Sequence, residues 1–156
     1  MSVLQDLVTE IETYPHTYLT VEVIDVDPPG SAINVNEDVT FNLQVTNSGP
    51  LNVKNLTLKI FALNGTQVKA AGAAAQWGTV AFSNTFDSVP AHQPNNPVVM
   101  TGSSLHLKAT RSSTTAADLI KVSVDEWDTD LDHPLIAHSD PDPTANTVYS
   151  STVSPA

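Results

Sequence analysis

The sequence predicts an all-β fold, an antiparallel sandwich of two sheets preceded by a short helix. A chain of 156 residues has the length of one ordinary domain that can bury a hydrophobic core. Apolar and polar residues alternate along several short segments, and turns rich in Asn, Gly and Pro separate these segments. Roughly seven to nine short strands with such spacing are typical of a two-sheet sandwich. No internal repeat and no linker divides the chain.

The first residues predict a short amphipathic helix over residues 2–13. Its apolar residues recur at the i, i+3, i+4, i+7 spacing of one helix face: Leu4, Leu7, Val8 and Ile11. Pro15 ends the helix, because the residue before a proline is disfavoured in the helical conformation. A helix this short is marginal alone, so its apolar face must dock on its own domain or bind a partner. We expect residues 1–15 to form this unit and residues 16–156 to form the single sandwich domain.

The clearest strand lies at residues 39–46, where apolar and polar side chains alternate strictly, as expected for one face on a core and one in water. Asn64-Gly65 is a strong hairpin signal that leads to a strand at residues 66–70. The prolines at positions 90, 94 and 97 predict a loop. Shorter alternating segments predict the other strands at residues 19–23, 56–63, 77–82, 105–109, 120–125 and 147–153, the last at a sheet edge.

The central segment is similar to a known family. Residues 39–46, the turn at residues 47–50 (Asn-Ser-Gly-Pro) and residues 53–60 resemble the CARDB-like and conserved-repeat domains of bacterial and archaeal surface proteins. Residues 122–125 (Val-Ser-Val-Asp) are similar to a late strand of that family that ends in Asp. The resemblance implies an immunoglobulin-like sandwich that serves as a non-catalytic building block. Members usually belong to secreted multidomain chains.

Composition excludes several function classes. The net charge of −11 disfavours nucleic acid and anionic membranes as partners. The absence of cysteine excludes disulfides, zinc–thiolate sites, iron–sulfur clusters and thiol nucleophiles. The sequence contains no phosphate-binding glycine loop and no nucleophile elbow, so we expect no enzyme. No signal peptide begins the chain and no membrane helix is predicted, so we expect a virion or cytoplasmic protein, or a cell-surface domain if it is excised from a larger chain.

The charges are divided along the chain. Residues 1–53 carry eight acids and no base, and residues 122–156 carry seven acids and no base. Residues 54–121 carry all six lysines and arginines with only two acids. These segments either form solvated faces of one domain or give the surface a polarity for assembly. In the second case, the basic middle of one copy meets the acidic ends of another, or the acidic surface meets a basic carrier lattice.

An acidic loop is predicted at residues 125–143. Its carboxylates are candidate calcium ligands, because calcium prefers several oxygen ligands: Asp125, Asp128, Asp130 and Asp132. An EF-hand is excluded, since His133 and Ser139 stand where that loop requires Gly and Glu. The alternative is a solvated loop with no ion. We expect no other cofactor, and we interpret the histidines as surface residues.

The two tryptophans, Trp77 and Trp127, are either core residues or platforms that stack on sugars. Together these patterns predict a non-catalytic structural module. Its most direct form is a virion accessory protein that decorates or cements a capsid, as a homo-oligomer or on a carrier lattice. The alternative is a surface or adhesion module, calcium-dependent or carbohydrate-binding, excised from a larger secreted chain.

Overall fold

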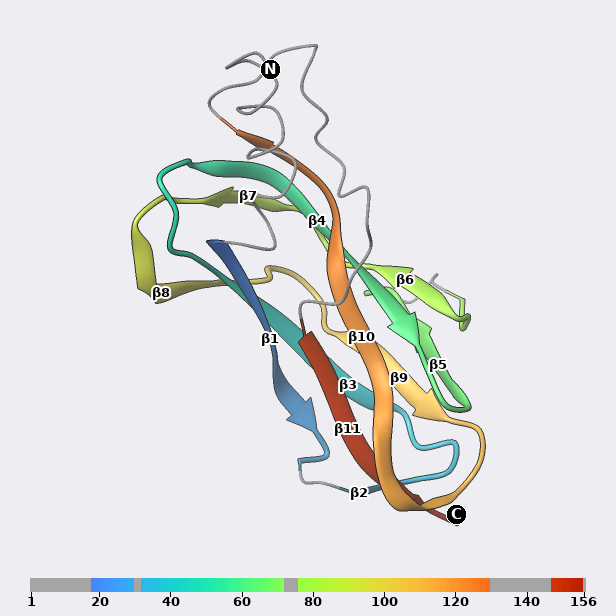
Figure 1. Ribbon diagram of the computed structural model, residues 1–156. Coiled ribbons are helices and arrows are strands. Elements are labelled where there is room, and N and C mark those ends of the chain that lie inside the picture. Colours follow the sequence, from blue (N-terminus) through green and yellow to red (C-terminus); the bar gives the residue numbers. More distant parts are fainter. Residues whose placement is uncertain (1–17, 30–31, 72–75, 130–146, 156) are drawn as a thin grey trace, which may run out of the picture.

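The computed structural model describes residues 18–29, 32–71, 76–129 and 147–155. Over these residues the chain is all-β, with eleven strands in two sheets that pack face to face as a sandwich (Figure 1). No helix among them is long and apolar enough to cross a membrane. The helix predicted over residues 2–13 lies outside the described residues, and so does its apolar face of Leu4, Leu7, Val8 and Ile11.

The first sheet, here called the β3 sheet, has the strand order β1-β3-β9-β5. β8 also pairs with β3, so β8 and β9 follow one another along the same side of that strand. All pairs in this sheet are antiparallel. Its strands are β1 (Leu19–Asp27), β3 (Val39–Asn47), β5 (Thr66–Lys69), β8 (Gln93–Val99) and β9 (Leu105–Ala109).

The second sheet, here called the β10 sheet, has the order β2-β11-β10-β4-β6, and β7 also pairs with β4. β2 and β11 are parallel, and the other pairs are antiparallel. Because β11 pairs with β10 on one side and β2 on the other, the prediction that it is an edge strand is wrong. The strands are β2 (Ala32–Asn34), β4 (Val53–Ala62), β6 (Val80–Phe82), β7 (Phe86–Val89), β10 (Ser113–Thr129) and β11 (Thr147–Ser154).

The core lies between the inner faces of the two sheets. β3 buries every second residue, which confirms the alternation seen in the sequence. Phe41 and Leu43 on β3 face the interior together with Leu58 and Ile60 on β4, and all four are fully buried. Lysines and other polar residues at the intervening positions stand on the outer faces. The functional surfaces are therefore built from these outward positions and from the sheet edges.

The turn at Asn64-Gly65 joins the two sheets. Both residues have positive φ, 52° and 74°, as this sequence pattern predicts. The following strand, β5, nevertheless pairs with β9 in the other sheet, so the predicted hairpin is wrong. The Asn64 side chain donates a hydrogen bond to the Asp118 carbonyl at 2.7 Å, and the Thr110 amide donates to the Gly65 carbonyl at 2.7 Å. Thr110 directly follows β9, the strand with which β5 pairs, so this second contact links the turn to the other sheet.

Gly65→Ala is expected to lower the free energy of unfolding by about 1 kcal/mol, because φ is +74° and a side chain disfavours that conformation. The added Cβ would also lie 2.5 Å from Nε of Arg111, whose side chain must move. Gly78→Ala is the matched control, since the nearest atom to its Cβ is 3.9 Å away and its φ is ordinary. We expect a change below about 0.5 kcal/mol there. Equal losses for both variants in urea denaturation would contradict this explanation.

The exposed edges of the sandwich resist pairing with another strand. β8 contains Pro94 and Pro97 and occupies a segment for which the sequence predicts a loop. That prediction is wrong, because proline is tolerated in edge strands. The register of β1 shifts between Ile24 and Asp27, and Asp25 within that shift has a φ of 53°. Such bulges, prolines and charges disfavour backbone association at an edge. Contacts with a partner at these two edges are therefore expected to use side chains.

Candidate functional site

A cluster of cations and one aromatic ring lies on the outer face of the β3 sheet, at its β5 edge. Lys69 on β5 and Lys108 on β9 point outward, because their neighbours in each strand are buried. Their Nζ atoms lie 4.9 Å and 4.5 Å from the ring centroid of Trp77. These distances are within the range of cation–π attraction. Trp77 is half-buried, so the cluster remains accessible from solvent.

The backbone next to Trp77 holds this ring in place. Gly78 exchanges two hydrogen bonds with Val68 of β5, at 2.8 Å and 2.9 Å. His106 of β9 meets the indole edge-on, with ring centroids 6.3 Å apart. His106 Nδ1 lies 2.8 Å from a carboxylate oxygen of Asp38 and donates to it, because a carboxylate only accepts. Asp38 thus orients the histidine, while the two lysines remain with the aromatic ring.

A second cluster lies on the outer face of the β10 sheet. Lys59 of β4 places its Nζ 5.2 Å from the ring centroid of Phe61 and 5.9 Å from that of Phe82. Phe82 is 45% exposed and Val80 is 40% exposed, both on the edge strand β6. Strand register aligns Val80, Phe61 and Lys121 in one row across β6, β4 and β10. This face therefore combines exposed apolar rings with cations.

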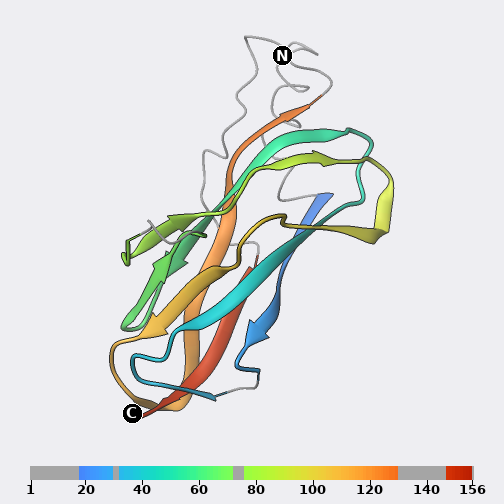
Figure 2. The same ribbon diagram turned by 180° about the vertical axis from the view of Figure 1, so that it is seen from behind.

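The two clusters flank one side of the sandwich. We call this surface the basic edge, defined by Lys59, Lys69, Trp77, Phe82 and Lys108. Its strands β5 and β6 contact each other and lie on the side opposite β1, as both views show (Figures 1 and 2). Within the described parts of the chain, several cations form no ion pair with a carboxylate: Lys59, Lys69, Lys108, Arg111 and Lys121. Although the sequence contains 17 acids, these five cations of the described residues are not neutralised by an ion pair.

The opposite edge of the β3 sheet is acidic. Glu22, Asp25 and Asp27 lie on β1, and all three are exposed. Glu22 accepts a hydrogen bond from Nε2 of Gln44 at 2.9 Å. β1 and β5 are the two ends of the strand order β1-β3-β9-β5. The segmental charges of the sequence therefore become two oppositely charged edges of one sheet.

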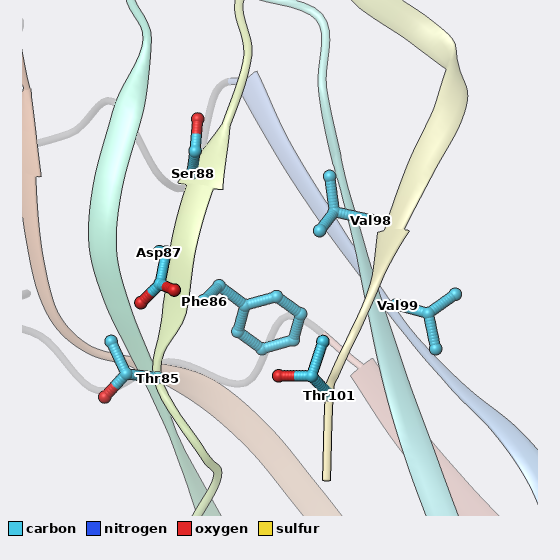
Figure 3. A pocket seen from close by; sticks show the side chains of 7 residues that line it. All are labelled: Thr85, Phe86, Asp87, Ser88, Val98, Val99 and Thr101. Atoms are coloured by element: carbon cyan, nitrogen blue, oxygen red, sulfur yellow. The ribbon is translucent and has the colours of Figure 1, made fainter.

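A groove with a volume of about 270 Å³ opens between β7 and β8, where strands from the two sheets face each other (Figure 3). The ring of Phe86 lies between these strands, and the Asp87 carboxylate points away from the ring. Its lining residues are Thr85, Phe86, Asp87, Ser88, Val98, Val99 and Thr101.

Two of the four predicted calcium ligands lie on a strand. Asp125 and Asp128 belong to β10, so the first residues of the loop predicted at residues 125–143 are part of this strand. Asp130 and Asp132 lie outside the described residues. A carboxylate oxygen of Asp128 accepts a hydrogen bond from Nδ2 of Asn55 at 3.0 Å. Where the structure describes the chain, no three His, Asp or Glu side chains come together as a metal site.

The two tryptophans differ in their surroundings. Trp127 is 1% exposed and belongs to the core, so it cannot serve as a platform for a sugar without unfolding of β10. Trp77 stays at the surface beside two lysines. Sequence reasoning named Trp77 but missed its cationic partners. The sequence does indicate that Lys69 and Lys108 point outward, since each lies at a polar position of an alternating segment. Alternation alone does not indicate which segments pair with each other.

Comparison with known proteins gives little further information. No family model matches the sequence, and a comparison with curated proteins found no match. Among solved structures, the chain is similar to the crystal structure of Spo0M, a sporulation control protein from Bacillus subtilis, with 12% sequence identity and a TM-score of 0.32. The similarity covers 88% of this chain and 49% of that chain, so this chain spans about half the length of Spo0M. A likeness of this size supports neither a family nor a function.

Proposed function

We propose that the chain is a non-catalytic structural module whose basic edge binds an acidic protein surface. The observation that carries this proposal is the set of unneutralised cations, which lie beside the half-exposed Trp77 and the exposed Phe82. Exposed aromatic rings are typical of protein interfaces, and local positive charge selects an acidic partner. Long-range repulsion from the net charge is screened beyond about 8 Å at physiological salt, so the local charges decide the contact.

We further propose that the sandwich is immunoglobulin-like, in keeping with its resemblance to the CARDB-like domains. The order β1-β3-β9-β5 supports this topology, because it follows the A-B-E-D order of an immunoglobulin sheet. The order β11-β10-β4 likewise follows G-F-C. β6, β7 and β8 are then an addition between the strands equivalent to D and E. This topology is a scaffold for interaction surfaces, which agrees with a structural role.

Among structural roles, we propose a virion accessory protein that decorates or cements a capsid, or a similar lattice-binding protein. Two features of the surface support such a role. Pro94 and Pro97 on β8 and the bulge at Asp25 on β1 disfavour strand addition at these two edges, which suits a folded module that docks there through side chains. One sheet also has edges of opposite charge, which suits repeated contacts in an ordered array.

The basic edge is tested with the double variant Lys69→Glu/Lys108→Glu and with poly-L-glutamate as the acidic probe. Titration calorimetry near 0.15 M salt, where repulsion from the net charge is screened, is expected to show binding to the unmodified chain. The double variant should bind at least tenfold more weakly, because like charges then face each other. Lys69→Arg/Lys108→Arg is the matched control, since arginine keeps the charge and the cation–π contact.

Thermal unfolding of each variant verifies that the sandwich remains folded. Two results would contradict the proposal: no binding by the unmodified chain, or equal binding by the folded glutamate variant. A loss of binding in the arginine variant would also count against it, because the positive charges are then still present.

A further inference from the structure

We propose that the acidic surface bound by the basic edge is the β1 edge of a second copy of this chain, so that copies join head to tail. This inference rests on the proposed function and names its partner. The two surfaces lie at opposite ends of the β3 sheet, with Lys69 on β5 at one end and Glu22 on β1 at the other. They are therefore available at the same time on each copy.

The acidic edge is as poorly neutralised as the basic edge. Within the described residues, the carboxylates of Asp25 and Asp27 form no hydrogen bond and no ion pair. Among the side chains that the structure describes, Glu22 forms a hydrogen bond only with the neutral amide of Gln44. Residues 1–53 contain no lysine or arginine, so no cation of the same strand competes for these acids. Each edge thus lacks the charge that the other one supplies.

The contact uses side chains on both surfaces. On β1, the register shift between Ile24 and Asp27 and the positive φ of Asp25 disfavour regular hydrogen bonds with a further strand at the C-terminal end, where Asp25 and Asp27 lie. On β5, Val68 already forms backbone hydrogen bonds with Gly78 on the side away from β9. A second copy therefore meets ammonium groups and aromatic rings rather than free backbone groups, and the resulting contact is weak and reversible.

The two surfaces differ, so the contact is heterologous. Each copy that uses its basic edge still presents its acidic edge, and the next copy can bind there. Repetition of one such contact produces a ring if the rotation closes and a filament if it does not. This property distinguishes the proposed contact from an isologous dimer, in which both copies use the same surface.

The salt dependence has a distinctive form. Copies with a net charge of −11 repel each other when the Debye length is long, about 30 Å at 0.01 M salt. At about 1 M salt the length is near 3 Å, so the attraction between exposed side chains is screened as well. Self-association is therefore expected to be greatest near 0.15 M salt and weaker at both extremes. Sedimentation velocity at several salt concentrations measures this profile.

The decisive experiment mixes two variants, each with one edge reversed in charge. The basic-edge variant is Lys69→Glu/Lys108→Glu, and the acidic-edge variant is Glu22→Lys/Asp27→Lys. Each alone should be monomeric near 0.15 M salt, because its one intact edge finds no complement. Their mixture should associate with the two variants in equal numbers, because the intact acidic edge of the first meets the intact basic edge of the second and the two reversed edges are also opposite in charge. Asp87→Lys on β7 is the control and should self-associate like the unmodified chain.

The outcomes separate this inference from the proposed function. One outcome is that the unmodified chain stays monomeric up to about 1 mM, a limit for very weak contacts, while its binding of poly-L-glutamate still depends on Lys69 and Lys108. That result overturns the inference and leaves the proposed function standing. If poly-L-glutamate does not bind either, both fail. A mixture of folded variants that gives no complex overturns the inference, and so does an Asp87→Lys variant that loses self-association.

Discussion

Replacing Trp127 by alanine is expected to lower the free energy of unfolding by about 3–5 kcal/mol, the largest effect that we expect from one substitution. Trp127 has the largest side chain among the fully buried ones and is 1% exposed. Its neighbours on β10, Glu126 and Asp128, both pair with β4, so the backbone around it is held in place and cannot fully collapse into the cavity. Urea denaturation followed by far-UV circular dichroism measures the loss without using tryptophan fluorescence.

The matched control is Trp77→Ala, which removes the same side chain from a half-buried surface position. The variant loses the ring contacts with the two lysines and His106 and buries no large cavity, so we expect a decrease of about 1 kcal/mol. Trp127→Phe should fall between these values, because it retains an aromatic ring in the core. Similar losses for the two alanine variants would contradict the assignment of Trp127 to the core and of Trp77 to the surface.

Asn47→Ala is expected to destabilise the domain by about 2–4 kcal/mol, because it leaves buried backbone groups without a hydrogen-bond partner. The Asn47 side chain is fully buried. Its Nδ2 donates to the carbonyls of Leu51 at 2.7 Å and Val89 at 3.1 Å, and its Oδ1 accepts from the amide of Gly49 at 3.0 Å. Alanine removes all three bonds at the point where β3 ends and the chain crosses to the other sheet.

Two further variants isolate the cause. Asn47→Asp has nearly the same shape and keeps the acceptor for Gly49, but it loses both donors and points negative charge at two carbonyls. We expect it to be at least as destabilising as Asn47→Ala. Asn96→Ala is the control, because Asn96 is exposed and its side chain bonds only the Gln93 side chain, so a change below about 0.5 kcal/mol is expected. A loss of similar size at both asparagines would refute the role given to burial.

The sequence predicts best those features that depend only on a few consecutive residues, such as the two faces of a strand. Strict alternation at residues 39–46 predicted β3, because a strand with one face on the core must alternate whatever its neighbours are. The Asn-Ser-Gly turn after it was also recognised from residue types, and Asn47 indeed bonds the amide of Gly49. In both cases the requirement lies within a few consecutive residues.

Predictions failed where the deciding contact is distant in the sequence. Prolines predicted a loop where β8 forms, because proline excludes only a strand that must bond on both sides, and β8 is an edge. Asn64-Gly65 has the backbone of a hairpin turn, yet the next strand pairs with β9 in the other sheet, and Gly65 accepts a bond from Thr110, which directly follows β9. Neither the edge position nor these partners can be recognised in a short window of residues.

The sequence by itself determined that the chain is built of two-faced strands, that Asn47 begins a tight turn, and that acids flank a basic middle, because each property belongs to consecutive residues. The tertiary structure alone decided which strands are neighbours. It brings Lys69, Lys108 and Trp77 together from three segments and places Glu22 at the other end of the same sheet. The physical reason is that pairing and packing minimise exposed apolar area and unbonded backbone over the whole chain, so surface charge follows the arrangement of the core.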